Sequence, residues 1–189
     1  MTELAFPDPP LTDRVVTLRR WHPADVPFVV AACQDPAAMQ FLPDLPRPYT
    51  EADALEWFVT HEPNRLARRA INFAVCRAAG GEPLGAVGLN RLDPELNLAE
   101  VGYWLAPAAR GFGYMSRAVR LLARWGFGGC GFGRLQLTTD PDNVASQRVA
   151  ERSGFHREGY LRSHLLVRRT GERRDSVLFG LLPDDLTDE

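Results

Sequence analysis

The segment from Arg110 to Ser116, Arg-Gly-Phe-Gly-Tyr-Met-Ser, has the composition of an anion-binding turn. It follows an apolar, strand-like run at 98–105 and leads directly into a helical pattern over 113–127. The first N–H groups of a helix have no partner within it, and the helix dipole adds roughly half a positive charge there. A pyrophosphate therefore fits at this turn without a dedicated side chain. The guanidinium of Arg110 adds a formal charge and a bidentate fork at the same place.

Two other phosphate-binding motifs are excluded by residue type. A Walker loop requires Gly-Lys-Ser/Thr, and every basic side chain counted among the 22 Lys and Arg residues is Arg. A dinucleotide fingerprint requires a third glycine three residues after Gly113, where this chain has Ser116. Taken alone, the segment has a plainer interpretation, a glycine turn that only reverses the chain.

A second candidate segment runs from Asp142 to Phe155. Its Asn143 and Ser146 are three residues apart, which places them on one face of a helix. Gly154 stands where a helix C-terminus favours a left-handed residue. An N-capped helix with no further role is the alternative, since asparagine is a good cap.

Hydrophobic periodicity and turn residues predict the elements that position these segments. The expected strands are 15–20, 71–77, 84–92, 98–105, 135–139, 158–167 and 175–181, and the expected helices are 23–34, 50–69, 113–127 and 144–153. We expect 35–48, with four prolines, to be loop. Thr50 and Asp53 form a capping-box pattern at the start of the second helix. This order predicts a mixed α/β (α+β) sheet covered by helices.

The composition fits one compact domain over residues 1–189. The net charge of -2 gives no electrostatic reason for a nucleic acid or membrane partner. No segment approaches the roughly 18 apolar residues of a membrane span, and Met1–Asp13 lacks the apolar core of a signal peptide. Cys33, Cys76 and Cys130 have no ligand-like spacing. We therefore expect a cytoplasmic protein with reduced, buried thiols and no metal.

The two segments together resemble the GNAT N-acetyltransferase superfamily, and within it the RimJ/RimL-like branch. The Arg/Gln-x-x-Gly-x-Gly/Ala motif is matched by Arg110 and Gly113, and the Asn-x-x-Ser helix ending in Gly-Phe is matched over 143–155. Further matches are the runs 18–25, 48–57, 157–162 and 175–179, so the resemblance covers nearly the whole chain. It implies the GNAT fold, a mostly antiparallel sheet of about seven strands flanked by about four helices.

The resemblance also implies acetyl-CoA as cofactor. The residues it assigns to the cofactor are Leu105, Arg110, Gly111, Phe112, Gly113, Tyr114, Met115, Ser116, Asn143 and Ser146. Met115 departs from the motif, which has a small residue there. Its bulk makes a CoA-binding regulatory module without catalysis the alternative function.

For the reaction, the resemblance implies direct acetyl transfer to a primary amine in a ternary complex. Glu100 is the candidate base, because the family places its strand beside the thioester; a structural hydrogen-bond acceptor is the alternative role. Ser146, or alternatively Tyr160, is the candidate group near the sulfur.

The acceptor is expected to be a protein N-terminus or a small-molecule amine, bound near the proline-rich 35–48 and the hairpin around 168–174. Trp57, Trp104 and His164 are candidate lining residues, although core packing is the plainer role of the two tryptophans. A homodimer that pairs the closing hairpins is a further alternative.

Overall fold

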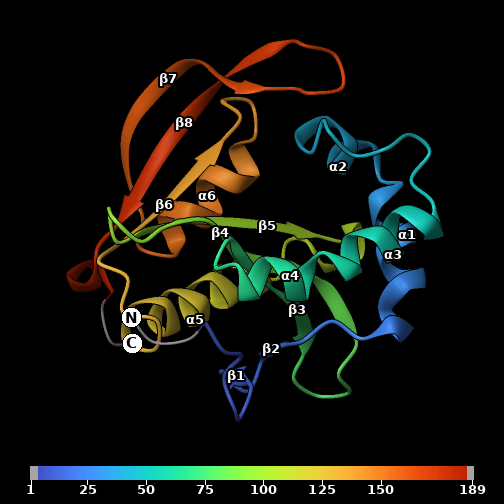
Figure 1. Cartoon of the computed structure of the whole chain (residues 1–189), viewed down its shortest axis with the longest axis horizontal. Helices are drawn as coiled ribbons and strands as arrows, with labels where there is room; N and C mark the ends of the chain where they lie inside the picture. Colours follow the sequence, from blue (N-terminus) through green and yellow to red (C-terminus); the bar gives the residue numbers. More distant parts are fainter. Residues whose placement is uncertain (1–3, 187–189) are drawn as a thin grey trace.

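The computed structural model describes residues 4–186, which form one sheet in the order β1-β2-β3-β4-β5-β6-β8-β7 (Figure 1). The strands are β1 Leu11–Thr12, β2 Val16–Arg19, β3 Ala70–Arg77, β4 Pro83–Asp93, β5 Leu98–Leu105, β6 Arg134–Thr139, β7 His156–Leu166 and β8 Arg173–Leu181. Only β5 and β6 pair in parallel among the described strands. The expected mixed, mostly antiparallel sheet is confirmed. It has eight strands instead of about seven, because 11–12 pairs with β2.

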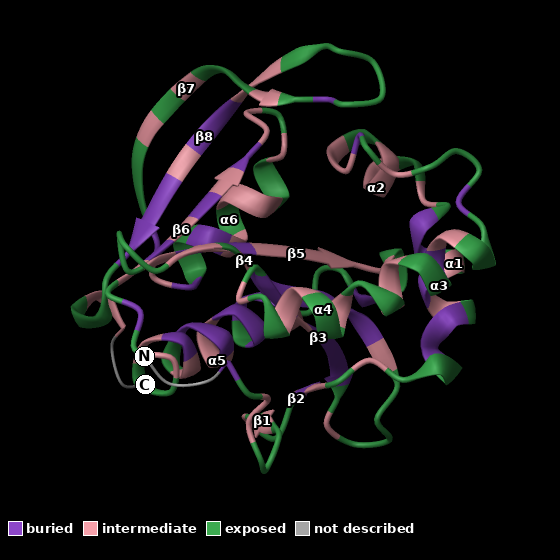
Figure 2. Ribbon diagram, in the orientation of Figure 1, coloured by how far each residue is buried: buried purple, intermediate pink, exposed green. Residues whose placement is uncertain are grey.

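The helices within residues 4–186 are α1 Val26–Cys33, α2 Pro36–Phe41, α3 Glu51–Val59, α4 His61–Leu66, α5 Tyr114–Gly128 and α6 Val144–Arg152. Short 3-10 turns lie at Pro23–Asp25, Pro107–Ala109 and Pro183–Asp185. The apolar face predicted for 113–127 is confirmed, since Met115, Ala118, Val119 and Leu122 are all buried. Figure 2 shows this buried stripe along α5 and a second one along β8.

Two expectations about helices were wrong. The helix expected over 50–69 is interrupted at Thr60, which ends α3 and precedes α4. Pro63 accounts for the break, because it offers no N–H to the preceding turn and its ring crowds that turn. The stretch expected to be loop contains α2, where the Asp35 side chain accepts the N–H of Ala38 and a proline occupies the first turn. The capping box of Thr50 and Asp53 is confirmed.

The sheet separates two hydrophobic clusters. The larger one includes α5 and residues of β2 to β6 and β8, with Val101 of β5 buried in it. The smaller one joins α1 and α3, with Val29 and Ala54 buried and Trp104 of β5 packed against them. Since side chains of a strand alternate between the two faces, odd-numbered positions near Val101 face α5 and even-numbered ones face α1 and α3. This alternation decides which β5 side chains lie on the α5 face of the sheet and which lie on the face covered by α1 and α3.

Candidate active site

The parallel strands β5 and β6 separate part-way along their length. They pair only from Leu98 with Arg134 to Glu100 with Gln136, whereas β5 continues to Leu105 and β6 to Thr139. Beyond Glu100 the two strands line opposite sides of a cavity of about 890 Å³, which we call the β5–β6 cleft. Backbone groups of β5 that would pair with β6 therefore face this cleft instead.

The predicted anion-binding turn lies at the cleft. Gly111 and Gly113 have φ of 86° and 76°, a left-handed conformation that favours glycine. Gly113 is the N-cap of α5 and supplies no side chain to cap it, so the first N–H groups of the helix have no capping partner. Gly113, Tyr114, Met115 and Ser116 all line the cleft. The structure thus offers backbone donors and the positive end of a helix dipole to an anion at this position.

Met115, the residue that departs from the family motif, is only 3% exposed and belongs to the core under α5. Its side chain is directed into the protein, so its bulk does not fill the turn. Phe112 differs from its neighbours: it is 66% exposed, stacks on Tyr114 at 5.6 Å and does not line the cleft.

Arg110 lines the cleft, but its guanidinium is engaged within the protein. Its Nη2 donates to Oδ2 of Asp35 at 2.7 Å and to the carbonyl oxygen of Leu105 at 3.0 Å. The hydrogen bond from Arg110 lowers the pKa of Asp35, so this carboxylate stays ionised. Arg110 therefore ties the end of β5 to the start of α2, a role that the motif alone did not indicate.

The segment after β6 places Asn143 and Ser146 together, as expected. Oδ1 of Asn143 accepts the N–H of Ser146 at 3.1 Å, so Asn143 does cap α6. Both residues line the cleft. The hydroxyl of Ser146 lies 2.9 Å from the hydroxyl oxygen of Tyr103, which also donates to the carbonyl oxygen of Ser146 at 3.0 Å.

Sequence reasoning missed Tyr103. Its odd position in β5 places it on the α5 side of the sheet, from where it reaches α6 across the cleft. Burial raises the pKa of Tyr103, so the hydroxyl remains protonated and can donate. The alternation of β5 could have assigned Tyr103 to a face, but the contact with Ser146 spans 43 residues and leaves no local signal.

Glu100 lies where β5 and β6 begin to separate, and its side chain is 16% exposed. Its Oε1 accepts the hydroxyl of Thr138 at 3.1 Å, and its Oε2 pairs with Arg91 Nη1 at 3.1 Å. Glu100 lines the cleft and, as an even-numbered residue of β5, belongs to the face opposite Tyr103. The carboxylate is held by two side chains from neighbouring strands.

The structure does not bring Tyr160 into this group. Tyr160 is 51% exposed, donates its hydroxyl to Oδ2 of Asp175 at 2.6 Å and does not line the cleft. The hydrogen bond to Asp175 raises the pKa of Tyr160. Of the two expected neighbours of the sulfur, Ser146 alone lines the cleft.

The walls of the cleft are strongly basic. Seven arginines line it, against three carboxylates; the arginines are Arg91, Arg110, Arg148, Arg152, Arg168, Arg173 and Arg174. Two arginines of the β7–β8 hairpin also reach the α2 segment, Arg174 through the carbonyl of Gln40 and Arg169 through that of Pro43. His164, a candidate lining residue, faces the cleft as well.

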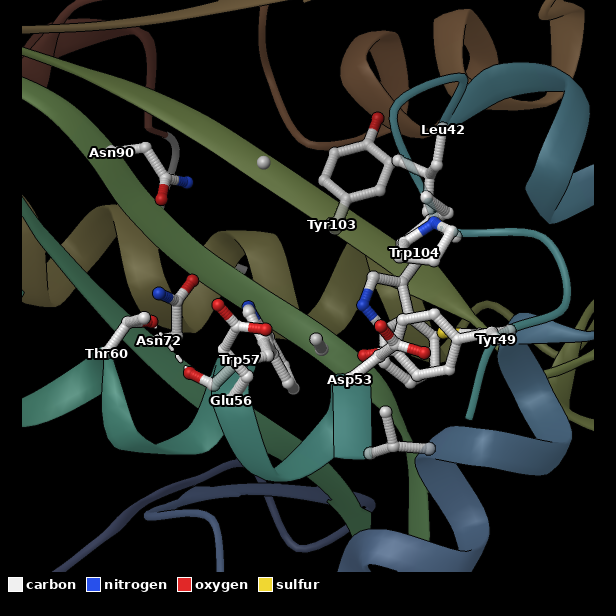
Figure 3. Close-up of a pocket in the computed structure, with 16 residues that line it drawn as sticks. Leu42, Tyr49, Asp53, Glu56, Trp57, Thr60, Asn72, Asn90, Tyr103 and Trp104 are labelled. Carbon is white, nitrogen blue, oxygen red and sulfur yellow. Dashed lines mark hydrogen bonds between the residues drawn. The ribbon is translucent and has the colours of Figure 1, made fainter. Parts of the chain in front are cut away.

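A second pocket of about 430 Å³ lies on the α3 side of β5 (Figure 3). We call it the α3 pocket. Trp57, Trp104, Asp53 and Glu56 line it. Four residues line both spaces and so connect them: Leu42, Gly102, Tyr103 and Trp104.

Other expectations concern thiols, metals and membranes. Cys33, Cys76 and Cys130 are free, and burial raises the pKa of each thiol to about 11. Residues 4–186 contain no cluster of three or more His, Cys, Asp or Glu side chains arranged to hold a metal ion. In the same range, no helix combines the length and apolar character needed to span a membrane.

The comparison with known proteins decides the family. Residues 16–156 match the acetyltransferase (GNAT) domain. This chain belongs to the GNAT acetyltransferase family. It is accordingly an N-acetyltransferase, an acyl-transferring enzyme, and the expected GNAT fold is confirmed.

Individual relatives of this GNAT enzyme cover most or part of its length. The uncharacterized N-acetyltransferase p20 of Bacillus licheniformis is 27% identical over 172 residues, which cover 90% of this chain and 94% of that one. The ribosomal-protein-serine acetyltransferase of Escherichia coli is 35% identical over 81 residues, which cover 43% and 45%. RimJ of Mycobacterium smegmatis, solved in complex with CoA-disulfide, shares the fold with a TM-score of 0.81 at 20% identity, covering 92% of this chain and 85% of that one. The expected likeness to the RimJ/RimL branch is thus confirmed.

Proposed function

We propose that this N-acetyltransferase takes acetyl-CoA and passes the acetyl group directly to a primary amine in a ternary complex, in the cytoplasm. The observation that carries the proposal is the separation of β5 from β6, which opens a basic cleft beside the uncapped start of α5. CoA carries a pyrophosphate and a further phosphate, and both the arginines and the helix N-terminus favour such a polyanion. The complex of RimJ with CoA-disulfide is consistent with this cofactor.

The residues that line the cleft can be assigned to parts of the cofactor. The N–H groups of Gly113 to Ser116 would receive the pyrophosphate, with Arg110 and Gly111 beside them. Leu105 ends the β5 wall, and Asn143 and Ser146 begin the opposite wall. Phe112, which faces solvent, would have no direct contact with the cofactor.

The reaction requires that a C–N bond forms as the C–S bond breaks. The amine nitrogen attacks the thioester carbonyl, and the oxyanion that develops is stabilised by a backbone N–H of β5 freed by the separation from β6. Glu100 takes the proton of the amine, directly or through water. At this step the Tyr103 hydroxyl donates to Oγ of Ser146, so the Ser146 hydroxyl donates its own proton to the departing sulfur and is reprotonated from solvent.

The demand on the base depends on the acceptor. Neutralising a lysine-type amine at pH 7 costs about 4.6 kcal/mol from its reference pKa, whereas a peptide α-amine costs about 1 kcal/mol. For either kind of amine, one carboxylate oxygen of Glu100 within reach of the amine or of a bridging water is enough to accept the proton.

The non-catalytic alternative depended on Met115 filling the turn, and the burial of that side chain takes this support away. The test is release of CoA thiol from acetyl-CoA on addition of a panel of primary amines, with the acetylated amine identified by mass spectrometry. Direct transfer predicts intersecting initial-rate lines for the two substrates. Parallel lines would indicate an acyl-enzyme, and binding of CoA without any transfer would favour the regulatory module.

A further inference from the structure

The α3 pocket reaches the β5–β6 cleft from the opposite face of β5. Its floor is formed by β3, β4 and β5, including Asn72, Asn90 and Gly102, and its outer wall by α3 (Figure 3). Glu100 is paired with Asn90 across β4 and β5, so its side chain belongs to this same face. A molecule in the α3 pocket would therefore present an amine to the cleft from the side of the proposed base.

Aromatic side chains form much of the wall of the α3 pocket. Tyr49, Trp57 and Trp104 line it. Trp21 packs behind two of them, with ring centroids 5.4 Å from Trp57 and 6.2 Å from Trp104, so the aromatic wall is supported from behind. Aromatic faces attract cations through the ring quadrupole.

The charges of the α3 pocket are all negative. Asp53 and Glu56 lie three residues apart on α3, one turn of the helix, and Figure 3 shows both carboxyl groups directed into the pocket. Hydrogen bonds from the Thr50 hydroxyl and N–H lower the pKa of Asp53, so that it is ionised at neutral pH. None of the sixteen residues that line the pocket is basic, whereas seven arginines line the adjoining cleft.

Unpaired polar groups complete the pocket. The Glu56 carboxylate forms no ion pair, and the side-chain amides of Asn72 and Asn90 form no hydrogen bond, with any of residues 4–186. The Asn90 amide lies over Gly102, where an added Cβ would be 3.1 Å from Nδ2. The pocket thus offers a free carboxylate and free amide groups beside aromatic faces.

We infer that the α3 pocket binds the acceptor and selects one that carries a second cationic group besides the amine to be acetylated, that is, a compact diamine or polyamine. The second cation lies between the carboxylates of α3 and the tryptophan faces, and the reacting amine points past Gly102 toward the cleft. An acidic peptide N-terminus is disfavoured, because its carboxylates would meet Asp53 and Glu56. This inference rests on the proposed acetyl transfer to amines.

The test compares the wild type with Glu56→Gln, and uses Glu51→Gln as a matched control on the same helix outside the pocket. We expect kcat/KM for 1,4-diaminobutane or spermidine to exceed that for n-butylamine by at least about tenfold, a 1.4 kcal/mol preference. Glu56→Gln should remove most of that preference and leave the KM for acetyl-CoA unchanged, and Glu51→Gln should behave as wild type. Equal rates for diamine and monoamine, or a Glu56→Gln enzyme with the wild-type preference, would overturn the inference.

Binding separates this inference from the proposed reaction. Calorimetry of spermidine with the CoA-saturated protein needs no turnover, and about tenfold weaker binding to Glu56→Gln supports the pocket even if the acetyl transfer is not seen. Binding that is equal in both proteins, or absent from the wild type at millimolar spermidine, would contradict it. Tighter binding of a peptide with an acidic N-terminus would do the same.

Discussion

The hydroxyl oxygen of Tyr103 lies 2.9 Å from Oγ of Ser146, so that a strand on one side of the β5–β6 cleft is joined to the first turn of α6 on the other. The same hydroxyl donates to the carbonyl oxygen of Ser146 at 3.0 Å. One phenol therefore fixes both the main chain and the side chain of the residue proposed to face the sulfur. A serine hydroxyl otherwise rotates freely, and this contact limits its orientation.

Removing the hydroxyl in Tyr103→Phe should lower kcat about tenfold and leave the KM for acetyl-CoA nearly unchanged, because the ring that packs in the core is kept. Ser146→Ala should have a similar effect. Since both changes break one hydrogen-bond unit, the double variant should be hardly worse than either single variant. Full activity of Tyr103→Phe, or additive losses, would contradict the assignment of Tyr103 as a positioning residue.

Glu100→Gln should lower turnover at least about tenfold, because the amide keeps the shape of the carboxylate but takes no proton from the amine. The thermal shift produced by acetyl-CoA should persist. Arg91→Gln is the control: it removes the 63% exposed partner of Oε2 and retains the carboxylate, so kcat should change little even where the loss of a cleft arginine raises the KM for acetyl-CoA. Unchanged turnover in Glu100→Gln would remove this residue from the mechanism and leave it a structural acceptor for Thr138.

Gly113→Ala should destabilise the fold by about 1–2 kcal/mol, because φ is 76° there and a Cβ is strained in that conformation. It should also weaken acetyl-CoA binding, because the backbone donors of the turn would shift. Gly128→Ala is the matched control, since Gly128 lies in α5 with open space where the Cβ would be. Urea unfolding checks the first effect, and equal stability of the two variants would contradict it.

The ion pair of Asp25 with Arg19, at 2.7 Å, ties the first helical turn to β2. It predicts that the free energy of unfolding falls at acid pH. Burial opposes ionisation, but hydrogen bonds from Arg19 and the His22 N–H outweigh it, and the pKa of Asp25 is lowered overall. Because the pKa is lower in the folded state, the ionised Asp25 stabilises the fold at pH values above its unfolded pKa of about 3.9. This stabilisation is lost as the pH falls through the folded-state pKa.

Asp25→Asn should therefore cost about 1–3 kcal/mol of unfolding free energy at pH 7. Urea unfolding should show the difference from wild type shrinking below about pH 4, where the wild-type carboxyl is protonated too. A difference that stays constant from pH 7 down to pH 3 would show that the charge of Asp25 has no part in stability.

The fold and the glycine turn before α5 could be predicted from sequence because their signals are local. Alternation marked β5, and the glycines of the turn preceded an amphipathic helix. Local rules could also have predicted α2 and the break between α3 and α4, which the sequence analysis missed. Asp35 before Pro36 is an N-cap followed by a first-turn proline, and Pro63 marks the helix break. The four prolines in 35–48 favoured a loop over the short helix that Asp35 and Pro36 begin.

The contacts that define the site were beyond local rules. Arg110 reaches Asp35 across 75 residues and Tyr103 reaches Ser146 across 43. Each depends on where two elements meet in space, which neither periodicity nor spacing records. The acidic character of the α3 pocket arises in the same way, because Asp53 and Glu56 become neighbours of Trp104 only when α3 packs on the sheet.

Thermal unfolding of the purified protein, alone and with acetyl-CoA, tests whether the β5–β6 cleft binds the cofactor. At about 100 times Kd, binding adds roughly 2.7 kcal/mol to stability, which raises Tm by about 5–10 °C for a chain of this size. We expect a shift of that order with acetyl-CoA and with CoA, and none with NAD or ATP. No shift at millimolar acetyl-CoA would contradict it, because the β5–β6 cleft would then not be a cofactor site.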